Sequence, residues 1–238
     1  MKHSLTHNII LRARIALNKL IVSAYLGHYR YLTRSHIMEK LGTVYGGWYI
    51  PSDIIRPDWI CYSGGAGEDI SFDMALHERF QCDVWIFDPT PRAIQYVRQK
   101  LLGKSGIQYK PVGLWSSRTT LKFYQPRDPA HVSHSTVNLQ KTDKYFESEC
   151  LSLSDLMVTL RHERLDLLKI DIEGAEHEVI RDMVAGNIRP QVLCLEIDQP
   201  VSPFNCIRTL KRIKSAGYEL GAVDGWNFSF IKTSAENI

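Results

Sequence analysis

The sequence predicts an α/β fold, built on a mostly parallel seven-stranded sheet with helices on both faces. From Pro57 onward, short apolar runs rich in β-formers alternate with helical patterns, which is typical of a parallel sheet covered by helices. A glycine-rich turn at 63–67 joins the first of these runs to a helix. The chain ends in two β-type runs separated by Asp224 and Gly225, a common turn dipeptide that predicts an antiparallel hairpin.

Length and composition limit the classes of function. The 238 residues suffice for one well-buried domain with a small appendage. A net charge of +3, without a dense Lys/Arg stretch, argues against nucleic-acid binding. The five cysteines are scattered and form no CxxC pair, so they indicate neither a zinc site nor a disulfide framework. Reduced thiols of this kind favour a cytoplasmic protein.

Residues 1–50 are expected to form a helical extension that ends irregularly, in the glycine- and aromatic-rich stretch Gly42–Pro51. Apolar residues recur at helical spacing at Ile9, Ala13, Ala16, Leu17 and Leu20. We expect this helix to pack on the main domain of residues 51–238, to form a homodimer contact, or to act as a lid over the binding site. Attachment to a membrane surface through its basic face is the alternative.

A transmembrane segment or a signal peptide is not expected at the N-terminus. Charged residues interrupt the apolar region, and the uncharged run Leu20–Gly27 is far too short to cross a bilayer. The region also lacks the unbroken apolar stretch and small-residue cleavage site of a signal peptide.

Within the main domain, the pattern of apolar runs gives the order of elements. Pro91 suits the first turn of a helix, and Gly103 suits its end. We expect helices at 70–79, 91–102, 174–185 and 204–215. We expect strands at 59–62, 84–87, 107–111, 119–124, 165–170, 192–197, 218–223 and 228–232.

The turn Ser63-Gly64-Gly65-Ala66-Gly67 lies where a nucleotide-type cofactor would approach the backbone closely. It does not match the GxGxxG fingerprint of dinucleotide binders, because Ile70 occupies the position of the third glycine. Glu68 and Asp69 at the start of the next helix would also repel a pyrophosphate. S-adenosylmethionine has no phosphate and carries a sulfonium cation, so the turn favours this cofactor over NAD.

Two acidic positions extend the cofactor hypothesis. Asp88 ends the second strand and is placed to accept both hydroxyls of a ribose, although it could instead cap the following helix. Asp171 ends another apolar strand and is followed by Glu173 and Glu176. Because open α/β sheets bind ligands at this edge, Asp171 is a candidate site residue. Glu176, in contrast, could simply compensate the dipole of its helix.

The segments LLKIDIEGAEHEVI and RPQVLCLEID, with IFDPTPRAI and LSLSDLM, resemble the FkbM-type family of S-adenosylmethionine-dependent methyltransferases over residues 60–232. The resemblance implies a class I methyltransferase (Rossmann-like) fold. It also implies O-methylation of a hydroxyl on a sugar, glycan or natural product. By position, Gly64, Gly65 and Gly67 would line the cofactor, and Asp88 would hold its ribose. Gly113 and Leu114, within 112–115, would lie near the adenine, and Asp171 near the sulfonium.

One departure from the family concerns the residue before the glycine turn. The family usually has an acidic residue there, whereas this chain has Tyr62 and Ser63. Ser63 is kept as a cofactor-binding candidate, and Glu68 or Asp69 would supply the missing charge.

Methyl transfer to a hydroxyl requires a base that removes the hydroxyl proton. The candidates are His134, Asp171, Glu196 and Asp198. Asp171 with Glu196 or Asp198 could alternatively bind Mg²⁺, which would acidify an acceptor oxygen. Because alternate residues of a strand face opposite ways, at most one of Glu196 and Asp198 would point into the site.

Two other functions remain open from the sequence. A non-catalytic binding module would retain the fold and lose the chemistry, and the altered Tyr62-Ser63 pair supports it. An NAD(P)-dependent oxidoreductase would share the topology but needs a better phosphate-binding turn. The partner in the main hypothesis is a small-molecule or glycan acceptor.

Overall fold

The computed structural model describes residues 2–27, 36–125, 142–197 and 201–233, with side chains from Ala13 onward. The helices are α1 (Lys2–Leu26), α2 (Ser71–Phe80), α3 (Pro91–Lys100), α4 (Leu153–Leu160), α5 (Glu176–Ala185) and α6 (Pro203–Ser215). The strands are β1 (Met38–Leu41), β2 (Trp48–Pro51), β3 (Ile60–Gly64), β4 (Asp83–Phe87), β5 (Ile107–Lys110), β6 (Gly113–Leu114), β7 (Thr119–Tyr124), β8 (Tyr145–Leu151), β9 (Leu167–Ile170), β10 (Val192–Glu196), β11 (Tyr218–Asp224) and β12 (Asn227–Lys232).

The predicted sheet is confirmed. Its seven strands lie in the order β11-β12-β10-β9-β3-β4-β5. Pairing is parallel from β5 to β10, and β12 runs antiparallel to both of its neighbours. The chain steps outward from β3 to β4 and β5, then returns to β9 on the other side of β3. A ligand crevice is therefore expected at the carboxyl ends of β3 and β9.

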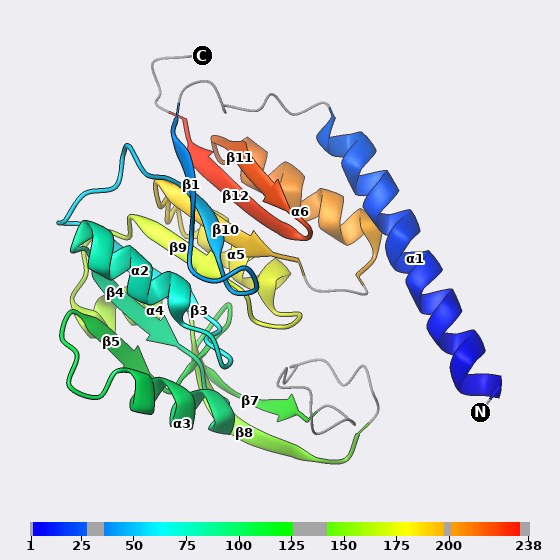
Figure 1. Cartoon of the computed structure of the whole chain (residues 1–238), viewed down its shortest axis with the longest axis horizontal. Helices are drawn as coiled ribbons and strands as arrows, with labels where there is room; N and C mark the ends of the chain where they lie inside the picture. Colours follow the sequence, from blue (N-terminus) through cyan, green and yellow to red (C-terminus); the bar gives the residue numbers. More distant parts are fainter. Residues whose placement is uncertain (1, 28–35, 126–141, 198–200, 234–238) are drawn as a thin grey trace.

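Helices cover both faces of the sheet, as predicted. In Figure 1, α2 and α3 lie in front of the sheet, and α5 and α6 lie behind it. Two clusters of buried apolar side chains result, one around Phe72, Ile86 and Val97 and the other around Leu156, Ile180 and Leu210. Strands β3, β4, β9 and β10 are covered on both sides. Their sequences are therefore mostly apolar, without the alternation of a strand that has one exposed face.

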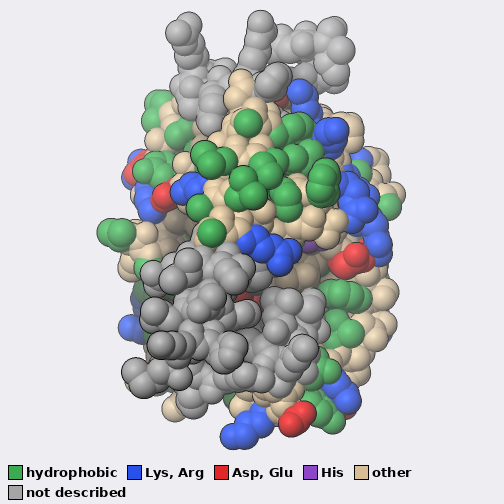
Figure 2. Space-filling view, turned by 90° about the vertical axis from the view of Figure 1, so that its right-hand side faces the viewer, with side chains coloured by type: hydrophobic (Ala, Val, Ile, Leu, Met, Phe, Trp, Pro, Cys, Tyr) green, Lys and Arg blue, Asp and Glu red, His purple; other side chains and the backbone are tan. Residues whose placement is uncertain are grey.

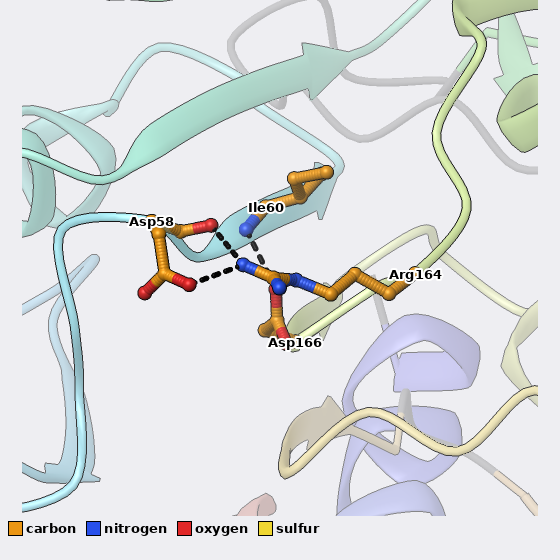
Figure 3. A network of polar contacts seen from close by, with 4 residues as sticks. All are labelled: Asp58, Ile60, Arg164 and Asp166. Atoms are coloured by element: carbon orange, nitrogen blue, oxygen red, sulfur yellow. Dashed lines mark hydrogen bonds and ion pairs between the residues drawn. The ribbon is translucent and has the colours of Figure 1, made fainter.

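A polar network fixes the amino ends of β3 and β9, at the edge of the sheet opposite the crevice (Figure 3). The Asp166 carboxylate accepts hydrogen bonds from the backbone N–H of Ile60 at 2.9 Å and from Arg164 Nε at 3.0 Å. Arg164 also donates to Asp58, with 2.7 Å between Nη2 and Oδ2. These contacts set the register of the two strands that carry the site.

The segment before Pro51 differs from the sequence prediction. It contains an antiparallel pair, β1 and β2, where an irregular chain was expected. Trp48 and Ile50 of β2 are buried, and β2 lies against β10, β11 and β12. Three further elements were not predicted: β6 and β8, which form a small sheet with β7, and α4, which begins with a capping box of Ser152 and Asp155. In β8, exposed and half-buried residues alternate up to Glu149, so the strand has no clear apolar pattern.

Helix α1 forms where it was predicted, and it packs on the domain through residues other than those of the predicted apolar face. The buried side chains are Asn18, Val22 and Leu26, which pack α1 on the domain beside α6. Leu17 and Leu20, which belong to the predicted apolar face, are exposed. Among the described residues, no helix combines the length and apolar character needed to span a membrane.

Candidate active site

The register of the sheet brings four residues into one row. Gly64, Phe87, Ile170 and Leu195 are paired across β3, β4, β9 and β10. The residues that follow them are therefore level at the carboxyl edge: Gly65, Asp88, Asp171 and Glu196. Hydrogen bonds continue this row beyond the strands, from Gly65 N to Phe87 O at 2.9 Å and from Asp171 N to Gly64 O at 3.0 Å.

A cavity of about 490 Å³ opens above this row. That volume is within the range of small-molecule and cofactor sites, roughly 300–1,000 Å³. Its wall combines the turn after β3, the ends of β4, β9 and β10, and the loop between β1 and β2. The residues lining it that bear on function are Tyr45, Gly65, Gly67, Asp69, Asp88, Gly113, Leu114, Phe123, Lys169, Asp171, Glu173 and Glu196.

Asp88 fastens the glycine turn to the end of β4. Its Oδ2 accepts hydrogen bonds from the backbone N–H groups of Ala66 at 2.9 Å and Gly67 at 3.0 Å. Its Oδ1 accepts from the backbone N–H and the hydroxyl of Thr90, at 2.8 and 2.7 Å. Asp88 is 5% exposed, so these donors compensate a largely desolvated carboxylate. A ribose hydroxyl would share the carboxylate oxygens with them.

Gly65 and Gly67 have different roles in the turn, although both have positive φ angles, +84° and +50°. A Cβ on Gly65 would lie 1.6 Å from the carbonyl oxygen of Asp171, so only glycine fits between β3 and β9. A Cβ on Gly67 would meet nothing within 4 Å. The surface at Gly67 therefore leaves room for a ligand to approach the backbone.

A buried lysine lies beneath the carboxylates of the site. Lys169 on β9 is 4% exposed, and its Nζ donates to the Gly65 carbonyl and lies 3.5 Å from Asp171 Oδ2. Burial alone would lower the pKa of Lys169, but Asp171, Asp73 and Glu196 raise it above the ordinary lysine value. Lys169 therefore stays charged and holds both the glycine turn and Asp171 in place.

Glu196 faces Asp171 across the neighbouring strands. Burial, the charge of Asp171 and a hydrogen bond with it raise the pKa of Glu196 to about 9. Glu196 therefore keeps its proton at neutral pH. The hydrogen bond joins Glu196 and Asp171 into a carboxyl pair at the carboxyl ends of β9 and β10.

The loop between β1 and β2 closes one side of the cavity. Thr43 Oγ1 donates to Asp69 Oδ2 at 2.6 Å, which ties this loop to the glycine turn. Burial raises the pKa of Asp69, but hydrogen bonds from Ser71 and Thr43 outweigh it and hold the pKa below the ordinary value. Tyr45 lies at the cavity rim with its side chain largely exposed.

Most of the predicted site residues meet at this cavity. Gly65, Gly67, Asp69, Asp88, Gly113, Leu114, Asp171 and Glu196 line it. Ser63 and Gly64 are buried in β3 and do not line it. His134 and Asp198 lie outside the described residues. Within the described parts of the chain, no group of three His, Cys, Asp or Glu side chains is arranged to hold a metal.

The acid missing before the glycine turn has a structural explanation. Tyr62 occupies that place, but its ring is buried and its hydroxyl hydrogen-bonds His162 Nδ1 at 2.7 Å. Glu68 lines the cavity, where its carboxylate pairs with Arg92 at 2.7 Å. Asp69 and Glu173 bring two further carboxylates to the cavity wall.

Sequence reasoning did not predict several residues of the cavity wall, among them Tyr45, Phe123, Lys169 and Glu173. A charged residue inside the buried run LLKI could have singled out Lys169, because a buried lysine requires partners. Tyr45 had no such signal, because its place depends on the unpredicted β1–β2 pair. Glu173 turns into the cavity through a left-handed backbone, with φ +54°, which the following Gly174 continues at φ +101°.

Comparison with known proteins agrees with this geometry. Residues 65–220 match the model of the methyltransferase FkbM domain family. The fold is similar to methyltransferase FkbM from Methylobacillus flagellatus KT, with a TM-score of 0.51 and 14% identity over 77% of this chain and 46% of that one. This chain thus spans less than half the length of that protein. None of the curated proteins matches the sequence.

Two further solved structures are more distantly similar. One is fibrillarin from Aeropyrum pernix in complex with natively bound S-adenosyl-L-methionine, at 12% identity over 82% of this chain and 87% of that one, with a TM-score of 0.41. The other is precorrin-6y C5,15-methyltransferase from Geobacter metallireducens GS-15, at 11% identity over 75% and 84%, also with a TM-score of 0.41. On the family match and the class I methyltransferase fold, the chain belongs to the FkbM family of S-adenosylmethionine-dependent methyltransferases.

Proposed function

We propose that this chain transfers a methyl group from S-adenosylmethionine to a hydroxyl oxygen of a sugar, glycan or natural product. One observation carries the proposal: the Asp171–Glu196 pair lies in the same cavity as the glycine turn and Asp88. A proton acceptor and a cofactor-sized cleft are thus combined in one place, which oxygen methylation requires.

The cavity wall fits the cofactor in both shape and charge. The open surface at Gly67 and the carboxylate of Asp88 suit the ribose, and Gly113, Leu114 and Phe123 form the adenine side. Asp69 and Glu173 provide negative charge for the methionine end, which bears an ammonium and the sulfonium. When bound, S-adenosylmethionine supplies an electrophilic methyl group on a positively charged sulfur.

In this proposal Asp171 is the base. Glu196 is protonated at neutral pH, so Asp171 is the member of the pair that can accept the hydroxyl proton. Lys169, 3.5 Å away, pairs with Asp171 and fixes its position. Asp171 would take the proton of the acceptor hydroxyl, and S-adenosylmethionine would supply the methyl group and depart as a neutral thioether. The earlier candidates His134, Asp198 and Mg²⁺ are not needed for this step.

Transfer of a deuterated methyl group tests the proposal. The protein is incubated with S-adenosylmethionine labelled as CD₃ and a panel of sugars, glycans and hydroxylated natural products, and NMR locates the label. We expect CD₃ on oxygen. Asp171→Asn should lower kcat by about 10²–10⁴-fold, the usual contribution of general-base catalysis. Asp182→Asn on α5, away from the cavity, is the matched control.

Two results would contradict this assignment. A label found on carbon or nitrogen would exclude O-methylation while leaving the methyltransferase activity intact. Full activity of Asp171→Asn would remove Asp171 from its role as base and return attention to His134 and Asp198. Binding of S-adenosylmethionine without turnover of any acceptor would favour the non-catalytic binding module.

A further inference from the structure

Helix α1 carries apolar side chains on two opposite sides. One side is buried against the domain and includes Val22 at 2% and Leu26 at 6% exposure. The other side is a stripe of Leu17, Leu20 and Ile21, exposed at 57%, 69% and 39%. At 100° per residue these three side chains point roughly away from Val22. The stripe is therefore not part of the packing that holds α1 on the domain.

The buried side anchors α1 firmly, so the stripe is a preformed surface. Asn18, 3% exposed, donates from Nδ2 to the carbonyl of Val201 at 2.7 Å, just before α6 begins. Helices α1 and α6 pack together beside this contact. Figure 2 views the molecule from the side of α1 and shows a patch of apolar side chains there with Lys and Arg around it. An apolar patch rimmed by polar residues marks an interaction surface.

The charged side chains of the two helices on this face are all basic. Arg14 and Lys19 are exposed and, by helical geometry, lie on either side of the stripe. Neither α1 nor α6 contains an Asp or a Glu, whereas together they carry eight Lys and Arg residues. The whole chain has 29 basic and 26 acidic residues, so the remainder of the chain is net acidic. The basic charge is thus concentrated on the two helices of this face.

We propose that the α1 stripe docks this protein on an anionic lipid membrane, with α1 lying in the plane of the interface. Exposed leucine and isoleucine between flanking basic residues are the composition of an interfacial helix: the apolar stripe enters the acyl boundary, and the basic side chains contact anionic headgroups. A second copy of the chain fits less well, because two α1–α6 faces would bring like charges together. The inference does not depend on the methyl acceptor.

Vesicle co-sedimentation of the full chain tests the docking. Wild-type protein should sediment with vesicles of phosphatidylcholine and phosphatidylserine, and much less with phosphatidylcholine alone. The double variants Leu17→Glu/Leu20→Glu and Arg14→Glu/Lys19→Glu should each lower partitioning by about tenfold or more. Val158→Glu on α4, where the native side chain is 77% exposed, is the control for a new surface charge and should bind as the wild type does.

Circular dichroism of each variant checks that it is folded, as we expect because the substituted side chains are exposed. Absence of wild-type binding to the anionic vesicles would overturn the proposal, as would binding of either double variant at the wild-type level. Equal binding to neutral vesicles would remove the electrostatic part of the argument. A wild-type dimer in sedimentation velocity that Leu17→Glu/Leu20→Glu dissociates would assign the stripe to a second copy instead.

Discussion

Lys169, Asp171 and Glu196 form the charged floor of the cavity, from two neighbouring parallel strands. Each would be costly to bury alone, but the ammonium compensates Asp171, and Glu196 avoids a second negative charge by keeping its proton. Sequence reasoning found the two acids because both directly end apolar runs. It missed Lys169, because the carboxylates that compensate the charge of this lysine are brought close to it only by the folded sheet.

The raised pKa of Glu196 gives the stability of the protein a characteristic pH dependence. Its folded-state pKa, about 9, exceeds the ordinary glutamate pKa of 4.5, so the native state binds more protons between these pH values. This contribution is present at low pH and is lost as pH rises through that window. Relative to wild type, Glu196→Gln should therefore gain about 1–3 kcal/mol of unfolding free energy between pH 6 and 9.

Urea denaturation at several pH values measures this difference. Glu147→Gln on β8, where the native side chain is exposed, is the control and should track the wild type. A constant difference between Glu196→Gln and wild type from pH 6 to 9 would show that Glu196 ionises normally.

At the scale of elements, the turn between β3 and α2 shows how local sequence and sheet register depend on each other. Glycine at 65 was predicted to permit close approach of a cofactor. The structure adds a different reason, since Gly65 passes the Asp171 carbonyl with no space for a Cβ. The close approach of β9 thus explains why residue 65 is glycine. Of Gly65 and Gly67, only Gly67 has open space beside it for a ligand.

Comparing Gly65→Ala with Gly103→Ala separates two causes of lost stability, the steric clash of a new Cβ and the strain of a positive φ angle. Both glycines have positive φ, +84° and +74°, but a Cβ at Gly103 meets nothing within 4 Å. Gly103→Ala should cost only the strain, about 1 kcal/mol. Gly65→Ala should cost about 2–4 kcal/mol more, because β3 and β9 must separate. Equal losses of unfolding free energy in urea denaturation would contradict the packing explanation.

At the scale of the whole molecule, the strands of the large sheet could be predicted, whereas β8 and the β1–β2 pair could not. The strands of the large sheet are short apolar runs between turn residues, so their order along the chain follows from the sequence. Strands β1 and β2 have only four residues each, and β8 is partly exposed and lacks a continuous apolar run. Helix α1 was recognised, but its two apolar sides made the packing face ambiguous, and Asn18 decides it through its bond to Val201.

The proposed cofactor site also depends on the whole fold, because the β1–β2 loop, the glycine turn and four strand ends together form the cavity. Asp88 connects two of these parts and faces the proposed ribose position. Asp83 begins the same strand, β4, at the opposite edge and is exposed. Asp88→Ala and Asp83→Ala are therefore a matched pair of variants.

Titration calorimetry with S-adenosylmethionine tests the central claim most directly. We expect micromolar binding by the wild type and by Asp83→Ala, and binding weakened about tenfold or more, equivalent to about 1.4 kcal/mol, by Asp88→Ala. The Asp88→Ala sample is checked for folding by circular dichroism, since it also loses the bonds to the glycine turn. Folded wild-type protein that binds neither S-adenosylmethionine nor its demethylated product would contradict the assignment of this cavity as a cofactor site.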